Sequence, residues 1–259
     1  MRGPGRASEE LALDEKADSI GWRPGAITYR TSLVIYYTLW AIISFLVHIL
    51  CRYQVVGREN IPRTGPMIVA VNHLHLLDPG AIAPAIPRKI MTLAAGKWRS
   101  NWAISLFLKG AGVIFVRRGE ADREAIRACL DVLAQGGVLA VAPEGTRSRT
   151  GGLQRGKPGI AYIAWRADVP ILPVASWGIE KIGMWKKLKR PTCRVVIGKP
   201  FRLPAFPKRP SGEQLQELAD LVMLRIGQQL PPDYRGVYAE RIAAIEAGES
   251  DELAVLRPA

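Results

Sequence analysis

A histidine and an aspartate lie five residues apart, directly after a short apolar stretch, in the segment Asn72-His73-Leu74-His75-Leu76-Leu77-Asp78-Pro79. On a continuous helix, two residues at this spacing lie about 140° apart, so their side chains meet only if the chain turns between them. If they meet, Asp78 accepts a hydrogen bond from one imidazole nitrogen, and His73 acts as a general base through the other. Asp78-Pro79 also has the pattern of a helix N-cap followed by a first-turn proline, which predicts that a helix starts at Pro79.

Two other interpretations of this segment stay open on the residues alone. Asp78 could be a helix cap and nothing more, or His73, His75 and Asp78 could together bind a metal ion. The chain has one further histidine, His48, which lies in a long apolar segment, so a complete set of metal ligands is hard to assemble. We therefore expect no metal at this site.

Two more groups of polar residues follow apolar stretches. Val113–Val116 leads into Arg117 and Arg118, which could clamp a phosphate or could simply be solvated. The segment Pro143-Glu144-Gly145-Thr146-Arg147-Ser148 offers a glycine for close backbone approach, two hydroxyls and a guanidinium suited to phosphate, although an ordinary polar turn has a similar composition. Upstream of both, Lys97 is another candidate cation.

Composition and charge limit the classes of protein that fit. The 259-residue chain is 48% apolar, enough for the core of one substantial domain, and it contains no internal repeats. Its three cysteines form no C-x-x-C pair, which argues against a disulfide framework or a zinc site and favours a reducing compartment. The formal net charge of +13 is concentrated between residues 145 and 212, where fifteen Lys or Arg residues stand against two acids. Such a field attracts phosphates on lipid headgroups, nucleic acid or a phosphorylated cofactor.

Leu33–Leu50 is an uninterrupted apolar segment that is long enough to be a membrane anchor. As a helix it spans ~27 Å, close to the hydrocarbon thickness of a bilayer. Tyr36, Tyr37 and Trp40 are residues favoured at membrane interfaces, and cations flank both ends of the segment. A buried core helix remains an alternative, and the sequence does not decide whether the segment crosses the bilayer or is partly embedded in it.

After this segment, strand and helix patterns alternate, which predicts an α/β fold: a single domain with a largely parallel central sheet flanked by helices, preceded by an N-terminal membrane-associated helix. The two prolines of Val169–Val174 predict an edge or irregular strand there. The expected strands are 67–71, 113–116, 138–142, 170–174 and 195–197, and the expected helices are 122–135, 160–166 and 214–229. We divide the chain into a polar tail (1–30), a membrane-anchoring helix (31–52), a catalytic domain (53–210) and a C-terminal helix with a polar tail (211–259).

Taken together, these segments resemble the glycerophospholipid acyltransferase family, in which NHxxxxD is followed by G-x-x-F-x-x-R, PEGTRS and V-P-[IV]-x-P-V blocks. All four occur here in that order between residues 72 and 174, and PEGTRS matches letter for letter. The resemblance covers roughly residues 53–205. It implies that His73 is the base that deprotonates the acceptor hydroxyl and that Asp78 orients it, while His75 occupies a variable position and has no role.

The resemblance also implies the residues that bind the substrate. The glycerophosphate part of the acceptor would be bound by Arg117, Glu144, Gly145, Thr146 and Arg147. Lys97 resembles the lysine of a family A-K-x-E-L stretch, although the glutamate of that stretch is missing here.

The implied activity is that of a membrane-bound O-acyltransferase. It would transfer a fatty acyl chain from acyl-CoA or acyl-carrier protein to a lysophospholipid, with 1-acyl-glycerol-3-phosphate as the expected acceptor and phosphatidic acid as the product. Because a thioester is already activated, we expect direct transfer without an acyl-enzyme or a cofactor. The expected partners are the two substrates and membrane lipids but not nucleic acid, and the expected location is the cell membrane, with the active site facing the cytoplasm.

Three alternatives to this function remain. The acceptor could be glycerol-3-phosphate or a different lysolipid, or the same dyad could activate water in a lipid hydrolase. A non-catalytic membrane protein that binds phosphate or nucleic acid would explain the charge but not the dyad. The basic stretch Lys181–Arg190 could rest on an anionic leaflet or could be a solvated surface loop.

Overall fold

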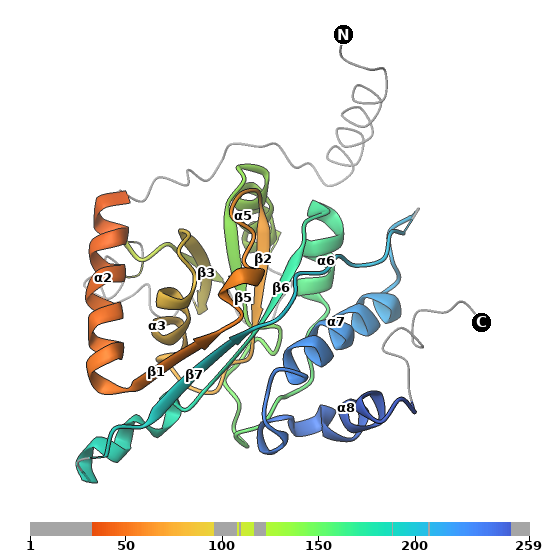
Figure 1. Ribbon diagram of the computed structural model, residues 1–259. Helices are drawn as coiled ribbons and strands as arrows, with labels where there is room; N and C mark the ends of the chain where they lie inside the picture. Colours follow the sequence, from red (N-terminus) through yellow and green to blue (C-terminus); the bar gives the residue numbers. More distant parts are fainter. Residues whose placement is uncertain are drawn as a thin grey trace.

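The computed structural model describes residues 33–95, 108, 110–116, 123–187, 189–206 and 208–249. Within them, one seven-stranded sheet has the order β1-β7-β6-β2-β5-β3-β4 (Figure 1). All neighbouring strands are parallel except β6 and β7, which are antiparallel. The strands are β1 (Arg52–Val56), β2 (Met67–Val71), β3 (Ile90–Ala95), β4 (Val113–Val116), β5 (Val138–Val141), β6 (Ile171–Trp177) and β7 (Thr192–Ile197). The predicted α/β architecture with a largely parallel sheet is confirmed.

Helices cover both faces of this sheet. The α-helices are α2 (Leu33–Leu50), α3 (Asp78–Ile82), α5 (Arg123–Ala134), α6 (Gly159–Ala167), α7 (Gly212–Gly227) and α8 (Ala239–Glu246). The short 3₁₀ helices are η1 (Arg58–Asn60), η2 (Ala83–Ala85), η4 (Ile179–Lys187), η5 (Pro232–Tyr234) and η6 (Gly236–Tyr238). In Figure 1, α6, α7 and α8 lie on one side of the sheet, and α2 and α3 lie on the other.

Strand β2 is buried from both sides, which explains its unbroken apolar sequence. Ile68 and Ala70 belong to the larger hydrophobic cluster, which includes residues of α5, α6 and α7. Met67, Val69 and Val71 face the opposite way and belong to a second cluster with residues of α3 and η2. The strand is therefore held rigidly, and the residues that follow its carboxyl end start from a fixed position.

Of the two alternatives predicted for the proline-containing strand, edge or irregular, the edge position is wrong, because β6 lies inside the sheet between β2 and β7. The carbonyl of Pro173 accepts a hydrogen bond from the backbone N–H of Gly198, at 2.9 Å. Since the nitrogen and carbonyl of a strand residue point to the same side, the proline nitrogen faces a place where β7 has already ended at Ile197. The proline carbonyl makes the hydrogen bond on this side, and β7 does not extend past it, so an interior strand accepts the proline.

Helix α2 packs alongside the domain but keeps most of its surface exposed. Trp40 Nε1 donates to the carbonyl of Ala83 at 2.7 Å, and the hydroxyl of Tyr36 accepts from the backbone N–H of Ile90 at 3.0 Å. Of its 18 residues, only Tyr36 and Val47 are buried. The alternative of a buried core helix is therefore wrong. The helix is long and apolar enough to cross a membrane, by length and composition.

Candidate active site

His73 and Asp78 meet through a tight turn that follows β2. His73 Nδ1 lies 2.8 Å from Asp78 Oδ2, and the same oxygen accepts the backbone N–H groups of Leu74 at 2.7 Å and His75 at 2.8 Å. The side chain of Asp78 is 2% exposed, whereas that of His73 is 22% exposed and so reaches solvent. Because an ionised carboxylate only accepts hydrogen bonds, Nδ1 carries the proton and Nε2 is left as the basic atom.

The prediction that Asp78 caps the following helix is corrected, because its carboxylate contacts the residues before the helix. Helix α3 begins at Asp78 itself rather than at Pro79, and no side chain caps it. The carboxylate instead turns back toward the preceding residues and accepts their N–H groups. The interpretation of Asp78 as a helix cap alone is therefore wrong, and one oxygen both closes the turn and contacts the imidazole.

The Pro143–Ser148 loop follows β5, the neighbour of β2, and binds the backbone of His73. The N–H of His73 donates to Glu144 Oε1 at 3.0 Å, and its carbonyl accepts from the N–H of Ser148 at 2.7 Å. Glu144 Oε2 accepts the N–H of Gln154 at 3.0 Å, so both carboxylate oxygens of this buried residue are engaged inside the protein. Burial raises the pKa of Glu144 above its ordinary value, although these N–H contacts oppose the shift.

Asn72 fixes the same turn to β6, a role that sequence reasoning missed. Its side-chain Nδ2 donates to the carbonyl of Ser176, and its Oδ1 accepts the N–H of Ser176, both at 2.8 Å. The only signal in the sequence is a polar residue between an apolar strand and His73, and that signal does not name a partner. Ser176 itself is fully buried, so its hydroxyl is not presented to a substrate.

The remaining predicted residues divide into two groups. Gly145, Thr146 and Arg147 lie in the loop beside the dyad, where Gly145 has a φ of 68° and its N–H closes a turn onto Ala142. Arg147 is exposed and Thr146 half-buried. Lys97 and Arg117 lie outside the described residues. Within the described part of the chain, no group of three His, Cys, Asp or Glu residues is placed to hold a metal ion.

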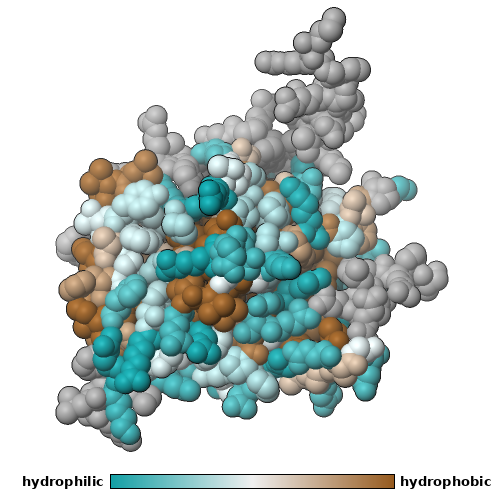
Figure 2. Space-filling model, viewed as in Figure 1, coloured by the Kyte–Doolittle hydropathy of each residue, from teal (hydrophilic) through white to brown (hydrophobic). Residues whose placement is uncertain are grey.

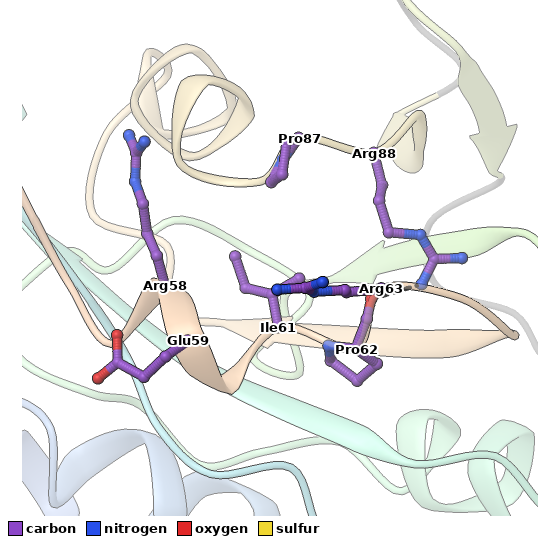
Figure 3. A pocket seen from close by; sticks show the side chains of 7 residues that line it. All are labelled: Arg58, Glu59, Ile61, Pro62, Arg63, Pro87 and Arg88. Atoms are coloured by element: carbon purple, nitrogen blue, oxygen red, sulfur yellow. Dashed lines mark hydrogen bonds between the residues drawn. The ribbon is translucent and has the colours of Figure 1, made fainter.

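A pocket of about 330 Å³ lies at the other end of β2 from the dyad. Figure 3 shows the side chains that line it. Arg58 and Arg63 on its lining precede β2, and Arg88 precedes β3, whereas the dyad follows β2. Arg88 donates to the carbonyls of Pro62 at 3.1 Å and Gly65 at 2.5 Å, so its guanidinium holds together the loops that lead into the sheet. We assign this pocket no part in the chemistry of the dyad.

Comparison with known proteins gives a family match and named relatives. A family model described as Acyltransferase matches residues 52–177. Over 197 residues the chain is 29% identical to 1-acyl-sn-glycerol-3-phosphate acyltransferase alpha of Homo sapiens, covering 71% of this chain and 67% of that protein. Over 176 residues it is 27% identical to 1-acyl-sn-glycerol-3-phosphate acyltransferase of Bacillus subtilis (strain 168), covering 67% of this chain and 85% of that protein. The family model and both relatives thus show that this chain is similar to acyltransferases.

The fold of this protein has a counterpart among solved structures. The crystal structure of the 1-acyl-sn-glycerophosphate (LPA) acyltransferase PlsC from Thermotoga maritima matches with a TM-score of 0.52 and 21% identity, over 95% of this chain and 100% of that one. The chain spans about two thirds or less of the length of the mammalian relatives that it matches. The family match contains His73, Asp78, the Pro143–Ser148 loop and Ser176.

Proposed function

We propose that this acyltransferase moves a fatty acyl chain from acyl-CoA or acyl-carrier protein to the free hydroxyl of 1-acyl-glycerol-3-phosphate, giving phosphatidic acid. One observation carries the proposal: the backbone of His73 is hydrogen-bonded on both sides to the loop that presents Arg147. A general base and a phosphate-binding guanidinium are thereby held in one unit. The names of the human and Bacillus relatives support this acceptor.

The dyad supports a direct transfer in two proton steps. His73 Nε2 takes the proton of the acceptor hydroxyl as the oxygen attacks the thioester carbonyl carbon and forms the acyl C–O bond. The tetrahedral intermediate then collapses, the C–S bond breaks, and the imidazolium returns the proton to the leaving thiolate. Asp78 stabilises the imidazolium between these steps, through the 2.8 Å contact with Nδ1. No cofactor takes part, because the thioester is already activated.

The residues of the loop divide the remaining work. Arg147 and Thr146 would bind the phosphate of the acceptor, together with Lys97 and Arg117. The geometry supports a different role for Glu144 from the substrate binding that the resemblance implied. Since its two oxygens accept the N–H groups of His73 and Gln154, we propose that Glu144 positions the base and does not touch the substrate.

Acyl transfer to a lipid requires contact with a membrane, and one face of the protein is suited to it. The large apolar residues that α2 exposes are Leu33, Val34, Ile35, Tyr37, Ile42, Phe45, Leu46 and Ile49. Figure 2 shows hydrophobic residues gathered over this helix at the left edge of the molecule. Leu76 and Leu77, in the turn between the two dyad residues, are also exposed. We propose that these residues enter the lipid while the catalytic domain remains on the cytoplasmic side of the cell membrane.

An acyl-transfer assay tests the enzymatic proposal. The full chain is offered a panel of lysolipids and glycerol-3-phosphate with both acyl-CoA and acyl-carrier-protein donors, and the products are separated from free fatty acid. We expect phosphatidic acid from 1-acyl-glycerol-3-phosphate, and loss of that product in His73→Ala. Release of free fatty acid without acylated acceptor would identify a hydrolase instead.

The membrane proposal needs variants that leave the packing of α2 intact. Val34 on α2 is 76% exposed, and Val237 in η6 is 69% exposed, so Val34→Ser and Val237→Ser are matched changes on different surfaces. We expect weaker flotation with liposomes for Val34→Ser, and more so for Val34→Ser/Phe45→Ser, with Val237→Ser unchanged. Equal flotation of all variants would show that α2 is not the lipid-binding surface.

A further inference from the structure

Lys157 lies at the predicted acceptor site although no sequence block singled it out. Its backbone N–H donates to the carbonyl of Pro143 at 2.8 Å, so the chain returns to the start of the Pro143–Ser148 loop after an excursion of several residues. Helix α6 begins two residues later, at Gly159. Lys157 therefore connects the Pro143–Ser148 loop with helix α6.

The return segment that carries Lys157 is firmly held. Leu153 is buried, and its N–H donates to the carbonyl of Tyr234 at 3.0 Å. Gly156, the residue before the lysine, donates its N–H to the hydroxyl of Tyr238 at 3.1 Å, and its carbonyl accepts from Gln216 Nε2 at 2.8 Å. The backbone of Lys157 thus has a fixed position relative to the loop.

The side chain of Lys157 lies over Gly145. A Cβ atom placed on Gly145 would be 3.1 Å from both Cδ and Nζ of Lys157 and 3.2 Å from its Cε. The end of the lysine side chain thus occupies the space that a side chain at position 145 would need. The glycine is required for two reasons: its φ of 68° is unfavourable for other residues, and its missing Cβ leaves room for the ammonium group.

The charges around this ammonium group favour an anion. Within the described residues, the Lys157 side chain has no hydrogen bond or ion pair, and Arg147 in the same loop has none either. The one acid of the loop, Glu144, directs both oxygens inward to backbone N–H groups. The exposed side of the loop therefore presents cations without a counter-ion.

We propose that Lys157 is a further binding residue for the phosphate of the acceptor, beside Arg147. Arg147 supplies a planar fork for two phosphate oxygens, and the Lys157 ammonium supplies a compact charge from above Gly145. This inference rests on the proposed function, because it names a residue for the same acceptor. It does not involve the acyl donor, so the two substrates should respond differently to its loss.

The kinetic test compares Lys157→Gln with Arg155→Gln, an equal loss of charge at an exposed residue two positions earlier. For Lys157→Gln we expect the apparent KM for 1-acyl-glycerol-3-phosphate to rise roughly 10-fold or more, as for a lost charge-assisted phosphate contact. The KM for the donor and the kcat should stay within about twofold, and Lys157→Arg should recover part of the loss. An equal KM change in Arg155→Gln, or a change confined to the donor, would overturn the assignment.

A second measurement does not depend on catalysis. Inorganic phosphate should raise the Tm of the wild-type protein and of Arg155→Gln, and it should raise that of Lys157→Gln markedly less. If the wild type acylates no phosphorylated acceptor but this difference in Tm persists, the proposed function fails and the anion site stands. If the wild type is active and the two variants respond alike to phosphate, Lys157 is not part of the site.

Discussion

Replacing Asp78 by Asn tests whether its charge, and not only its shape, serves His73. The amide oxygen can take the position of Oδ2 and still accept from His73 Nδ1, Leu74 and His75, so the turn is expected to persist. What is lost is the negative charge beside the imidazolium. For an Nδ1–Oδ2 contact of 2.8 Å the charge centres lie about 4 Å apart, and at an effective dielectric constant of about 20 their attraction is ~4 kcal/mol.

This energy sets an upper bound on the effect. About 4 kcal/mol corresponds to roughly 10³-fold, and the partial exposure of His73 screens some of it. We therefore expect kcat to fall ~10²–10³-fold, with little change in either KM. The Asp78→Asn protein should still fold, with a modest loss of stability. Asp78 Oδ1 has no hydrogen-bond partner among the described residues, so the new NH₂ group is buried without an acceptor, at a cost of ~1–3 kcal/mol.

The assay is a double-mutant cycle of kcat with His73→Ala, Asp78→Asn and the combined variant, each checked by thermal melting. If Asp78 acts only through the imidazole, the combined variant should be no slower than His73→Ala alone. A further loss of the full 10²–10³-fold in the His73→Ala background would show that Asp78 acts independently. That result would refute the dyad.

Three further predictions follow from the same contacts. His73→Ala should lower kcat ~10²–10⁴-fold, whereas His75→Ala should change it far less, because the imidazole of His75 only accepts a long 3.3 Å hydrogen bond from a backbone N–H. Burial raises the pKa of Glu144 above 4.5, so the native state binds more protons than the unfolded state in the window above that value. The stability of the wild type relative to Glu144→Gln should therefore increase as the pH falls through this window. Urea unfolding of both proteins at about pH 8 and about pH 5 measures this difference. A relative stability that decreases as the pH falls would contradict the raised pKa of Glu144. Burial raises the pKa of Cys193 to about 12, and it also raises the pKa of Cys51. An aromatic disulfide reagent should therefore label neither thiol until the protein is unfolded.

The sequence predicted the segment from His73 to Asp78, the Pro143–Ser148 loop and a largely parallel sheet whose strands precede them. Each of these features carries a pattern that is local along the chain. Strands β1 and β3 were both missed. Strand β1 is short, has no fully buried residue and closely follows an apolar helix, so its residues carry no clear strand pattern. The interior place of β6 depends on where β7 ends, and no local pattern contains that information.

The role of Glu144 shows the same limit at the site. The family resemblance implied that Glu144 binds the glycerophosphate part of the acceptor, but both of its carboxylate oxygens accept backbone N–H groups inside the protein. Both donors lie outside the loop: His73 follows β2, and Gln154 lies in the segment that follows Ser148. A backbone N–H can donate whatever the type of its residue, so a single sequence does not predict these hydrogen bonds. The sequence singled out the His73–Asp78 turn and the Pro143–Ser148 loop, but it did not predict the contacts that hold them together.

Hydrogen bonds join α2 to the rest of the domain, and they limit which variants can test its role. Deleting residues 1–50 removes the exposed apolar face, but it also removes the acceptor of the Ile90 N–H and the donor to the Ala83 carbonyl. Arg190 would lose one of its two carbonyl partners at the end of the helix, since it donates to His48 at 2.6 Å as well as to Cys51 at 3.0 Å. A truncated protein that loses activity could therefore be either detached from lipid or poorly folded. The Val34→Ser/Phe45→Ser variant separates these causes, because both side chains are largely exposed, so their replacement should weaken the proposed lipid contact and leave the packing of the domain unchanged.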